Sequence, residues 1–403
     1  MTARSGEPLT VVGLISGTSI DGIDVAAARL CAEDGEDGAV ALTPIAEAEI
    51  PYPEELRERL LGALPPNPCS AEELTRLDTL VGQSFAEAAA TGVDLAGGAD
   101  LIASLGQTVF HWVENGRARG TLQLGQPAWI AERTGLPVVA DLRARDVAAG
   151  GHGAPLASTL DQLWLRGLAE DSGKAAVGLN IGGIANITVV RADTGALAYD
   201  TGPGNALLDL AATEVAGQRS DFGGRLAAAG RVHSGLLDRL LTDPYYAAPP
   251  PKSTGKEHFH TDYLRTHIGD LTLSGEDLLA TLTELTAATI AAECARHEAG
   301  TVVASGGGVE NPALMRALAA RLTAELRTSD ELGLPRAAKE AYLTALLGWL
   351  TWHGQPANLP SATGAAGPRL LGSITPGAHP AALPPPLPAV ITRLRIAPRG
   401  KTR

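Results

Sequence analysis

Two glycine-rich turns, each between two apolar segments, could bind an anion. The first is GTSIDG over residues 17–22, and the second is Gly182-Gly183. A turn rich in Gly, Ser and Thr can direct several backbone N–H groups at one anion. Either turn alone is more often an ordinary hairpin turn. The pair, together with a glycine run at 306–308 after a further apolar segment, indicates nucleotide binding.

Asp200 is the candidate for acid–base chemistry. It ends the apolar segment ALAYD and directly precedes TGPGN, where Asn205 begins a helical pattern. A carboxylate at a strand end that opens into a helix is a common place for a catalytic base. From the residues alone, a turn or helix-capping aspartate is an equal alternative. If phosphate is bound, further carboxylates in glycine-rich surroundings could meet Mg²⁺: Asp21, Asp24, Asp141 and Asp146.

Cationic and sulfur-containing side chains give weaker indications. Arg143 lies between Asp141 and Asp146, where it could bind a substrate carboxylate through two hydrogen bonds or form a surface ion pair. His111 and His152 are isolated, which favours structural or substrate-contacting roles over metal binding. The three cysteines are widely spaced and include no CxxC pair, so a disulfide framework and a zinc site are both improbable.

Composition and absent motifs narrow the class of protein. The 403 residues include 32 Lys+Arg and 45 Asp+Glu, a net charge of −13, which argues against a nucleic-acid partner. The sequence contains no GxxxxGK[ST], no dinucleotide fingerprint, no HExxH and no GxSxG. No signal peptide is visible, and the most apolar late segment, 341–352, is too short to cross a bilayer. We therefore expect a cytoplasmic protein without a membrane partner.

Apolar patterning predicts the elements that must position these residues. Segments 9–16 and 23–30 are predicted strands joined by the first turn, and 175–190 is a predicted strand–turn–strand around the second. Each hairpin is an apolar strand, a glycine-rich turn and a return strand. This repetition predicts a duplicated α/β fold of two lobes in which one turn from each lobe faces the cleft. The proline-rich segment 244–260 is predicted to be an ordered loop or a lid.

Several longer blocks occur in one order and carry a family resemblance. They are GLISGTSIDGID, GQTVFH, TLQLGQPAWIAERTGLPVVADLRARDVAAGGHGAPL, LNIGGIANIT, DTGPGNALLD, PPKSTGKEHF, DLLATLTELTA and SGGGVENPALM. From about residue 11 to residue 375 the chain resembles 1,6-anhydro-N-acetylmuramic acid kinases. The resemblance implies an α/β, two-lobed actin-like ATPase (ribonuclease H-like) fold with a central cleft. The implied N-terminal lobe is 1–145, completed by about 365–403, and the second lobe is 146–364.

The resemblance also implies a reaction. An ATP-dependent hydrolytic kinase of this family opens the bicyclic sugar 1,6-anhydro-N-acetylmuramic acid during peptidoglycan recycling. Water attacks C1, O6 takes the γ-phosphoryl group of ATP with Mg²⁺, and N-acetylmuramic acid 6-phosphate is released. Asp200 matches the general base in the D-x-G-P-G-N motif. The implied partner is a small amino sugar, and the implied assembly is a homodimer.

Residue roles follow from the turns and the resemblance together. The predicted ATP-binding residues are Gly17, Thr18, Ser19, Ile20, Asp21, Gly22, Ile23, Asp24, Gly182, Gly183, Gly306, Gly307 and Gly308. The predicted substrate-binding residues are Gln107, His111, Arg143, Asp146, His152, Asn186 and Glu340. Asp21 is the predicted Mg²⁺ ligand.

The chain departs from the family pattern at a few positions. Leu105 and Glu310 each stand where the family usually has His, and Trp112 follows His111 where Pro is usual. Ala157-Ser158 replaces a common Val-Pro. None of these changes touches Asp200 or a phosphate turn. They leave open a related sugar kinase with a shifted substrate. A nucleotide-binding regulator without turnover is a second alternative, against which the presence of Asp200 argues.

Overall fold

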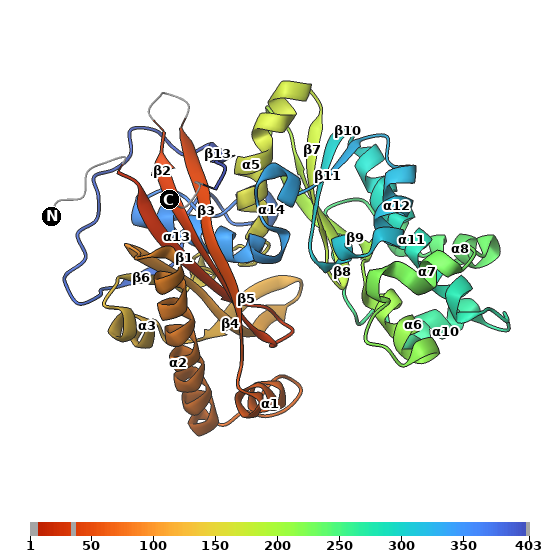
Figure 1. Cartoon of the computed structure of the whole chain (residues 1–403), viewed down its shortest axis with the longest axis horizontal. Helices are drawn as coiled ribbons and strands as arrows, with labels where there is room; N and C mark the ends of the chain where they lie inside the picture. Colours follow the sequence, from red (N-terminus) through yellow and green to blue (C-terminus); the bar gives the residue numbers. More distant parts are fainter. Residues whose placement is uncertain (1–6, 34–37, 400–403) are drawn as a thin grey trace. The chain divides into compact units, whose positions relative to one another are not determined.

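The computed structural model describes residues 7–33 and 38–399 (Figure 1). The chain packs as two compact units: unit 1 holds the residues up to Trp164 and those from Gly333 onwards, and unit 2 holds Leu165–Leu332. Segments 146–164 and 333–364, which the sequence prediction placed in the second lobe, pack with unit 1. One reason is a buried junction at Asp146, whose carboxylate accepts hydrogen bonds from Asn358 and Thr363.

Unit 1 is built on one mixed sheet. Its strand order is β12-β6-β4-β1-β2-β3-β13, and β5 pairs with β4. β1 runs antiparallel to β2 and parallel to β4, β2 runs antiparallel to β3, and β4 runs parallel to β6. The strands are β1 (Leu9–Ser16), β2 (Gly22–Ala32), β3 (Ala39–Pro51), β4 (Leu101–Glu114), β5 (Arg117–Leu124), β6 (Val138–Ala140), β12 (Ser373–Thr375) and β13 (Arg393–Ile396).

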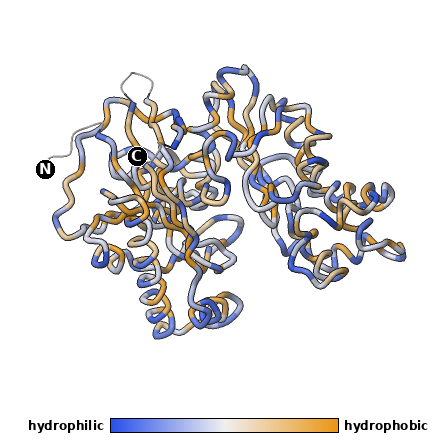
Figure 2. The backbone as a smooth tube through the Cα atoms, in the orientation of Figure 1, coloured by the Kyte–Doolittle hydropathy of each residue, from blue (hydrophilic) through white to orange (hydrophobic). Residues whose placement is uncertain are grey.

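Helices cover both faces of this sheet. Val12 and Leu14 pack with Phe85 of α2 on one face. Gly13, between them, points to the other face, where an added Cβ would collide with the backbone of Ala341 in α13. In Figure 2 the central strands between these helices are mainly hydrophobic. The helices of unit 1 are α1 (Glu54–Gly62), α2 (Ala71–Ala96), α3 (Pro127–Thr134), α4 (Ala144–Ala148), α13 (Lys339–Trp352) and α14 (Pro360–Thr363), and α5 (Ala157–Ser172) crosses the boundary between the units.

Unit 2 repeats the topology of unit 1. Its sheet has the order β11-β10-β7-β8-β9, with β7 antiparallel to β8 and parallel to β10, β8 antiparallel to β9, and β10 parallel to β11. The same order and directions hold for β6-β4-β1-β2-β3. The strands are β7 (Ala175–Ile181), β8 (Ile184–Val190), β9 (Leu197–Pro203), β10 (Ala299–Ser305) and β11 (Glu325–Thr328). The duplicated α/β fold predicted from the repeated hairpin is confirmed.

Helix α11 (Gly275–Arg296) is the centre of unit 2. By length and composition it could cross a membrane, but 83% of its most apolar window is buried inside the protein. One side packs on the sheet with α12 (Pro312–Arg321), and the other packs on a helical cluster. The remaining helices of unit 2 are α6 (Ala206–Ala216), α7 (Arg225–Ala229), α8 (Ser234–Leu241), α9 (Pro244–Ala247) and α10 (Thr261–Ile268), with short 3₁₀ turns at Phe222–Gly224, Gly307–Glu310 and Asp330–Leu332. A further 3₁₀ turn, Arg336–Ala338, precedes α13 in unit 1.

Candidate active site

In unit 1 the predicted phosphate turn lies between β1 and β2. Ile20 anchors it: its side chain is buried in the core, its N–H donates to the Gly17 carbonyl at 3.2 Å, and its φ is +54°. The Ser19 hydroxyl donates to Asp21 Oδ1 at 2.9 Å. Thr18 and Ser19 are exposed. Ile20 and Ile23 were both predicted to bind ATP, but the side chains of both are buried in the core of unit 1. Only their backbone atoms are therefore available to a nucleotide.

Gln107, a predicted substrate-binding residue, supports this turn. Its side chain is fully buried, its amide donates to the Gly17 carbonyl at 3.1 Å, and its Oε1 lies 2.6 Å from the Ser16 hydroxyl. The Ser16 hydroxyl also lies 2.6 Å from the Gly22 carbonyl at the other end of the turn. The contacts of Gln107 are thus with the turn, and its role towards the sugar stays a prediction.

Beyond the turn, carboxylates gather around Asp24. Asp24 stands opposite Glu49 of β3 in the strand register. Burial, followed by repulsion from Glu49, Glu340 and Asp21, raises the pKa of Asp24 to about 7. This local excess of negative charge suits a cation, and Mg²⁺ in phosphoryl-transfer sites commonly uses one or two carboxylates plus substrate phosphate. Within the described ranges no three His, Cys, Asp or Glu residues form a ready-made metal cluster, so Asp21 stays a predicted ligand.

The DLRARD and GHG segments form a second polar region of unit 1. Asp146 is fully buried, and its carboxylate accepts from the Gly153 N–H at 2.8 Å as well as from Asn358 and Thr363. Its contacts hold the loop together, and its predicted contact with the sugar remains untested. Arg143 donates to the Gly153 carbonyl at 2.7 Å, while its Nε is buried without a partner among the described residues. That leaves Arg143 a donor for a ligand oxygen.

The two predicted histidines of unit 1 are both exposed. His111 Nδ1 lies 2.9 Å from the Thr121 hydroxyl across the β4–β5 pair. Partial burial, and then the charge of Arg143, lower the pKa of His111, which favours the neutral imidazole. His152 is fixed by its backbone N–H, which donates to the Thr363 carbonyl at 2.9 Å. Both rings are therefore free to contact a small ligand.

In unit 2 the second predicted phosphate turn is held by the start of α6. The Gly183 carbonyl accepts from the N–H groups of Gly204 and Ala206, and the Gly182 carbonyl accepts from that of Asn205, at 2.8–2.9 Å. In a trans peptide the N–H points opposite to the carbonyl, so the Gly183 N–H points away from α6. This leaves it available to an anion.

Lys256 is a site candidate that the sequence analysis missed. A Cβ added at Gly183 would lie 2.9 Å from Lys256 Cε and 3.7 Å from Nζ, so the exposed lysine crosses directly over the turn. A cation beside a glycine turn is suited to phosphate oxygens. The signal was present in the KSTGK segment, where the lysine lies three residues after Ser253.

The glycine run at the end of β10 packs on the same turn region. Added Cβ atoms at Gly306 and Gly308 would collide with Asn180 and Ile181, and Gly306 has a φ of +83°. At Gly307 an added Cβ meets nothing within 4 Å. Gly306 and Gly308 are thus required by packing, whereas Gly307 presents open backbone that a ligand can approach.

Asp200 belongs to a polar row that crosses three strands of unit 2. In the strand register Asn180 of β7 stands opposite Asn186 of β8, which stands opposite Asp200 of β9. Directly opposed residues point to the same face of a sheet. The row therefore places the predicted base beside the predicted substrate residue Asn186, and adds Asn180, which the sequence analysis did not identify.

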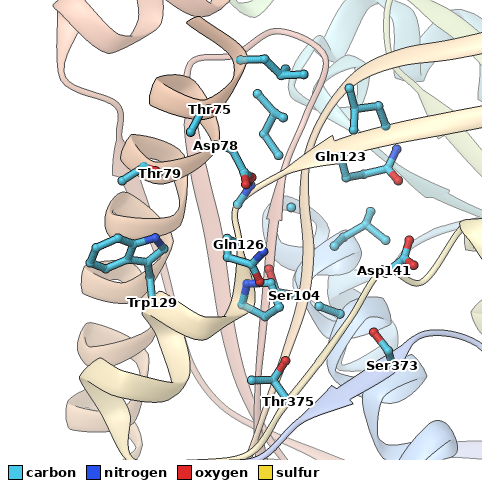
Figure 3. Close-up of a pocket in the computed structure, with 18 residues that line it drawn as sticks. Thr75, Asp78, Thr79, Ser104, Gln123, Gln126, Trp129, Asp141, Ser373 and Thr375 are labelled. Atoms are coloured by element: carbon cyan, nitrogen blue, oxygen red, sulfur yellow. The ribbon is translucent and has the colours of Figure 1, made fainter. Parts of the chain in front are cut away.

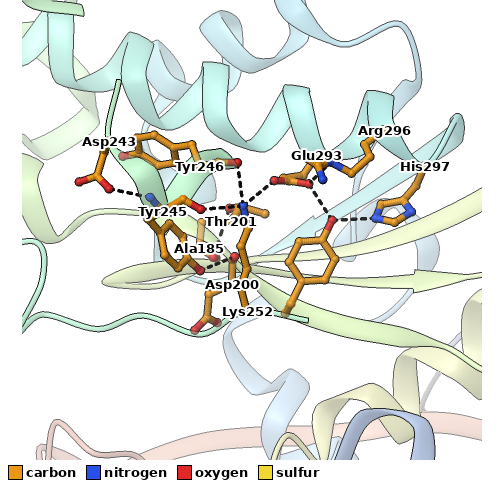
Figure 4. Close-up of polar contacts among 11 residues, drawn as sticks. Ala185, Asp200, Thr201, Asp243, Tyr245, Tyr246, Lys252, Glu293, Arg296 and His297 are labelled. Carbon is orange, nitrogen blue, oxygen red and sulfur yellow. Dashed lines mark hydrogen bonds and ion pairs between the residues drawn. The ribbon is translucent and has the colours of Figure 1, made fainter. Parts of the chain in front are cut away.

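The loop after α9 contacts Asp200 directly. The Ser253 hydroxyl and the Thr254 N–H both donate to Asp200 Oδ2 at 3.0 Å. The Tyr245 hydroxyl donates to the Asp200 carbonyl at 2.7 Å (Figure 4). Oδ1 accepts no hydrogen bond from the described chain. Burial raises the pKa of Asp200, opposed by the Thr254 and Ser253 hydrogen bonds and reinforced by the charge of Glu257. One carboxylate oxygen is thus fixed and the other is available as a proton acceptor.

A separate pocket of about 570 Å³ lies in unit 1 between α2, α3 and strands β4, β5, β6 and β12 (Figure 3). Asp78, Ser104, Gln126 and Asp141 line it, and so does Leu105, where the family usually has His. Asp141 was one of the candidate carboxylates for Mg²⁺, but the pocket lining includes none of the predicted ATP- or sugar-binding residues. The prediction that the two phosphate turns face each other across a cleft involves both units and stays a prediction.

Comparisons with known proteins agree with the residue-based resemblance. The family model for anhydro-N-acetylmuramic acid kinase matches residues 9–377. A protein of that name from Streptomyces avermitilis is 55% identical over 94% of this chain and 97% of its own length. One from Rhodococcus erythropolis is 50% identical over 92% and 95%.

Solved structures align less closely. Component A of (R)-2-hydroxyglutaryl-CoA dehydratase from Acidaminococcus fermentans covers 84% of this chain and 96% of its own, with a TM-score of 0.40 and 14% identity, which adds nothing about function. The relatives from Streptomyces and Rhodococcus are named as kinases, which are phosphotransferases, and half or more of the aligned residues are identical to this chain over nearly its whole length. The chain therefore belongs to the anhydro-N-acetylmuramic acid kinase family.

Proposed function

We propose that this kinase couples hydrolysis to phosphoryl transfer: it converts 1,6-anhydro-N-acetylmuramic acid, water and ATP to N-acetylmuramic acid 6-phosphate and ADP, as part of peptidoglycan recycling. The observation that supports this proposal best is the state of Asp200. Its Oδ2 is held by Ser253 and Thr254, and its Oδ1 is left as an acceptor. A kinase that phosphorylates an existing hydroxyl also uses such a base, so entry of water oxygen at C1 is what distinguishes the hydrolytic reaction.

In the proposed reaction Asp200 accepts the proton of the attacking water. As water attacks C1, its proton passes to Asp200 Oδ1 and the C1–O6 bond breaks. O6 then takes the γ-phosphoryl group while the bond from the γ-phosphorus to the bridging oxygen of ADP breaks, and ADP leaves. A base works best when its pKa lies near the working pH, and burial raises the pKa of Asp200 from its ordinary value. Asn186, its neighbour in the row, can donate to or accept from a sugar hydroxyl.

ATP is the donor, and the two glycine turns are the proposed phosphate-binding elements. Gly17–Ser19 and Gly183 supply backbone N–H groups, Lys256 supplies a cation, and Gly307 supplies open backbone. Mg²⁺ would be held by Asp21 at the edge of the Asp24 carboxylate group and would neutralise charge on the phosphates. Arg143, His111, His152 and Glu340 are the proposed sugar contacts in unit 1.

An Asp200→Asn substitution tests the base. It keeps the shape of the side chain and cannot accept the proton, so we expect kcat to fall about 10²–10⁴-fold while KM for ATP and sugar stay near wild type. Sugar-dependent ADP release gives the rate, and mass spectrometry of the product in H₂¹⁸O shows whether water oxygen enters at C1. Near-normal kcat in Asp200→Asn, or no ¹⁸O in the wild-type product, would refute the mechanism. Thermal melting of the variant checks that the fold is intact.

We also propose a homodimer in the cytoplasm. Phe110, Trp112 and Leu122 on the β4–β5 hairpin are large apolar side chains with 47%, 51% and 39% of their surface exposed. Such exposed groups often mark contact surfaces. The cysteines are free thiols, including exposed Cys69, which suits a reducing compartment. Sedimentation velocity and cell fractionation test these two points, and a monomer or a secreted protein would contradict them.

A further inference from the structure

Three consecutive residues, 252–254, each form a hydrogen bond with Asp200. The Asp200 N–H donates to the Lys252 carbonyl at 3.1 Å, and Ser253 and Thr254 donate to its carboxylate. The backbone on one side of Asp200 and the carboxylate on the other are thus both tied to the same short segment. The position of Oδ1, the proposed proton acceptor, depends on where this segment lies.

The chain immediately before this segment is poorly equipped to hold it. Residues 249–251 are three prolines, which have no N–H and cannot donate a backbone hydrogen bond. Lys252 supplies the missing anchor through its side chain. Its ammonium donates to Glu293 Oε1 at 2.8 Å and to the carbonyls of Tyr245 and Tyr246 at 3.2 and 3.1 Å. Three acceptors match the three N–H donors of an ammonium group, so its hydrogen bonding is complete.

Glu293 connects the loop segment 252–254 to strand β9, which carries Asp200. Its other oxygen accepts from the Tyr199 hydroxyl at 2.9 Å and from Arg296 at 3.0 Å (Figure 4). Tyr199 directly precedes Asp200 on β9. The side chains of Lys252 and Glu293 are each only 5% exposed. A single carboxylate on the central helix α11 therefore holds both the strand that carries Asp200 and the loop that donates to it.

We propose that Lys252 is a positioning residue for Asp200: its buried ion pair with Glu293 holds residues 252–254 against β9, so that Ser253 and Thr254 fix one carboxylate oxygen and present the other to water. The proposal rests on the proposed role of Asp200 as the base. Lys252 itself takes no proton and touches no substrate. Its effect on the rate is exerted through the geometry and the charge of Asp200.

A Lys252→Met substitution tests this through kcat and its pH dependence. Freed from its anchor, the segment loses its hydrogen bonds to the carboxylate, and a misplaced base costs about 10²-fold in kcat. Hydrogen bonds to a carboxylate favour its charged form, so losing them raises the pKa of Asp200 further. The acid limb of the kcat profile moves to higher pH. The charged or titratable groups next to Asp200 are Lys252, Tyr245 and Glu257, and of these only Lys252 is changed. KM for ATP and for sugar stay within about twofold.

Two further variants separate positioning from a loss of stability. Removing one member of a buried ion pair leaves an uncompensated charge. Lys252→Met/Glu293→Gln removes both charges and keeps an amide oxygen as acceptor for the Tyr199 hydroxyl. It should show the same moved acid limb. Leu318→Ala creates a cavity in the core of the same unit without touching the loop, and should lower Tm while leaving the acid limb unchanged. If both Lys252 variants keep the wild-type acid limb, or lose no more kcat than Leu318→Ala, the proposal fails.

Combining Lys252→Met with Asp200→Asn distinguishes this proposal from the proposed function. If Lys252 acts through Asp200, the double variant has the kcat of Asp200→Asn alone. A further tenfold loss in the double variant would overturn the positioning role and leave the base role intact. Near-normal kcat in Asp200→Asn, by contrast, would overturn the base role itself, whatever Lys252→Met does.

Discussion

The two units place different side chains at equivalent positions of the same sheet. In unit 1 the row across the three antiparallel strands is Ile15, Asp24 and Glu49, and in unit 2 it is Asn180, Asn186 and Asp200. Both rows begin at the end of the central strand beside a glycine turn. In unit 1 two carboxylates oppose each other, and the pKa of Asp24 rises to about 7. In unit 2 one carboxylate stands beside amides and loop donors. Equivalent positions of a duplicated scaffold thus hold opposed carboxylates in unit 1, and a carboxylate beside amides in unit 2, where we propose the base.

The two glycine turns also differ, in the kind of group that supports them. Side chains support the first, because Ile20 anchors it in the core and Gln107 bonds its backbone. Backbone groups support the second, because three N–H groups at the start of α6 donate to its carbonyls. A substitution of a supporting side chain can therefore loosen the first turn. At the second turn, the side chain to substitute is Lys256, which lies over it.

Asn186→Asp would make the row of unit 2 resemble that of unit 1, and we expect the largest effect from it. A second carboxylate opposite Asp200 raises the pKa of Asp200 by repulsion. Only the deprotonated form accepts a proton, so kcat falls about tenfold for each unit of pH below the new pKa. The loss is deepest at low pH and recovers as the pH rises above the new pKa. A pH series of kcat measures it, and Asn186→Ser, which adds no charge, should leave the acid limb in place.

Lys256→Met tests the cation over the second turn. A charged hydrogen bond contributes about 1.5–3 kcal/mol, so KM for ATP should rise about tenfold or more while KM for the sugar changes little. Initial rates at varied ATP and sugar measure both constants. Lys174→Met is the matched control, because Lys174 precedes β7 at the opposite end of that strand from the second turn. Unchanged ATP affinity in Lys256→Met would exclude the lysine from the nucleotide site.

Gln107→Leu tests the support of the first turn. Loss of the Gln107 hydrogen bonds to Gly17 and Ser16 loosens the turn, so KM for ATP should rise about three- to tenfold. If Gln107 instead binds the sugar, as the sequence predicts, KM for the sugar rises and that for ATP does not. Isothermal titration with a non-hydrolysable ATP analogue and with the sugar, separately, decides between these roles.

Glu49→Gln should have the smallest effect, on stability alone. The pKa of folded Asp24 is about 7 against an ordinary 3.8, so the folded state binds more protons across that interval. Stability contributed by protonated Asp24 is therefore lost as pH rises from about 4 to 7. Removing the Glu49 charge lowers the pKa of folded Asp24, so the loss of stability becomes smaller and ends at a lower pH, although burial, the larger cause of the shift, remains. Melting temperatures from pH 4 to 8 measure the slope, which Asp24→Asn should remove. An unaltered slope in Glu49→Gln would contradict the assigned repulsion.

Local patterns in the sequence predicted the fold well because they report on nearest neighbours in the chain. The repeated hairpin of strand, glycine turn and strand identified the duplication, and the strand end at Asp200 identified the candidate base. The roles of Ser253, Thr254 and Glu293 could not be predicted, since they depend on contacts across 53, 54 and 94 positions from β9. The burial of Asp146 and Gln107 escaped prediction for the same reason, because a polar residue in a motif gives no sign of whether its partners are protein or ligand.

The parallel pairing of β13 with β3 has a consequence for biosynthesis. It joins residues 393–396 to residues 39–42, and α13, from Lys339, covers one face of the same sheet. Unit 2, by contrast, is one uninterrupted stretch from Leu165 to Leu332. On the ribosome the N-terminal strands emerge first but lack the helix that covers them, while the later unit can bury its core as soon as its own residues are out. We therefore expect unit 2 to fold before the sheet of unit 1 is complete. In that interval the sheet face that α13 later covers is open to chaperones or aggregation.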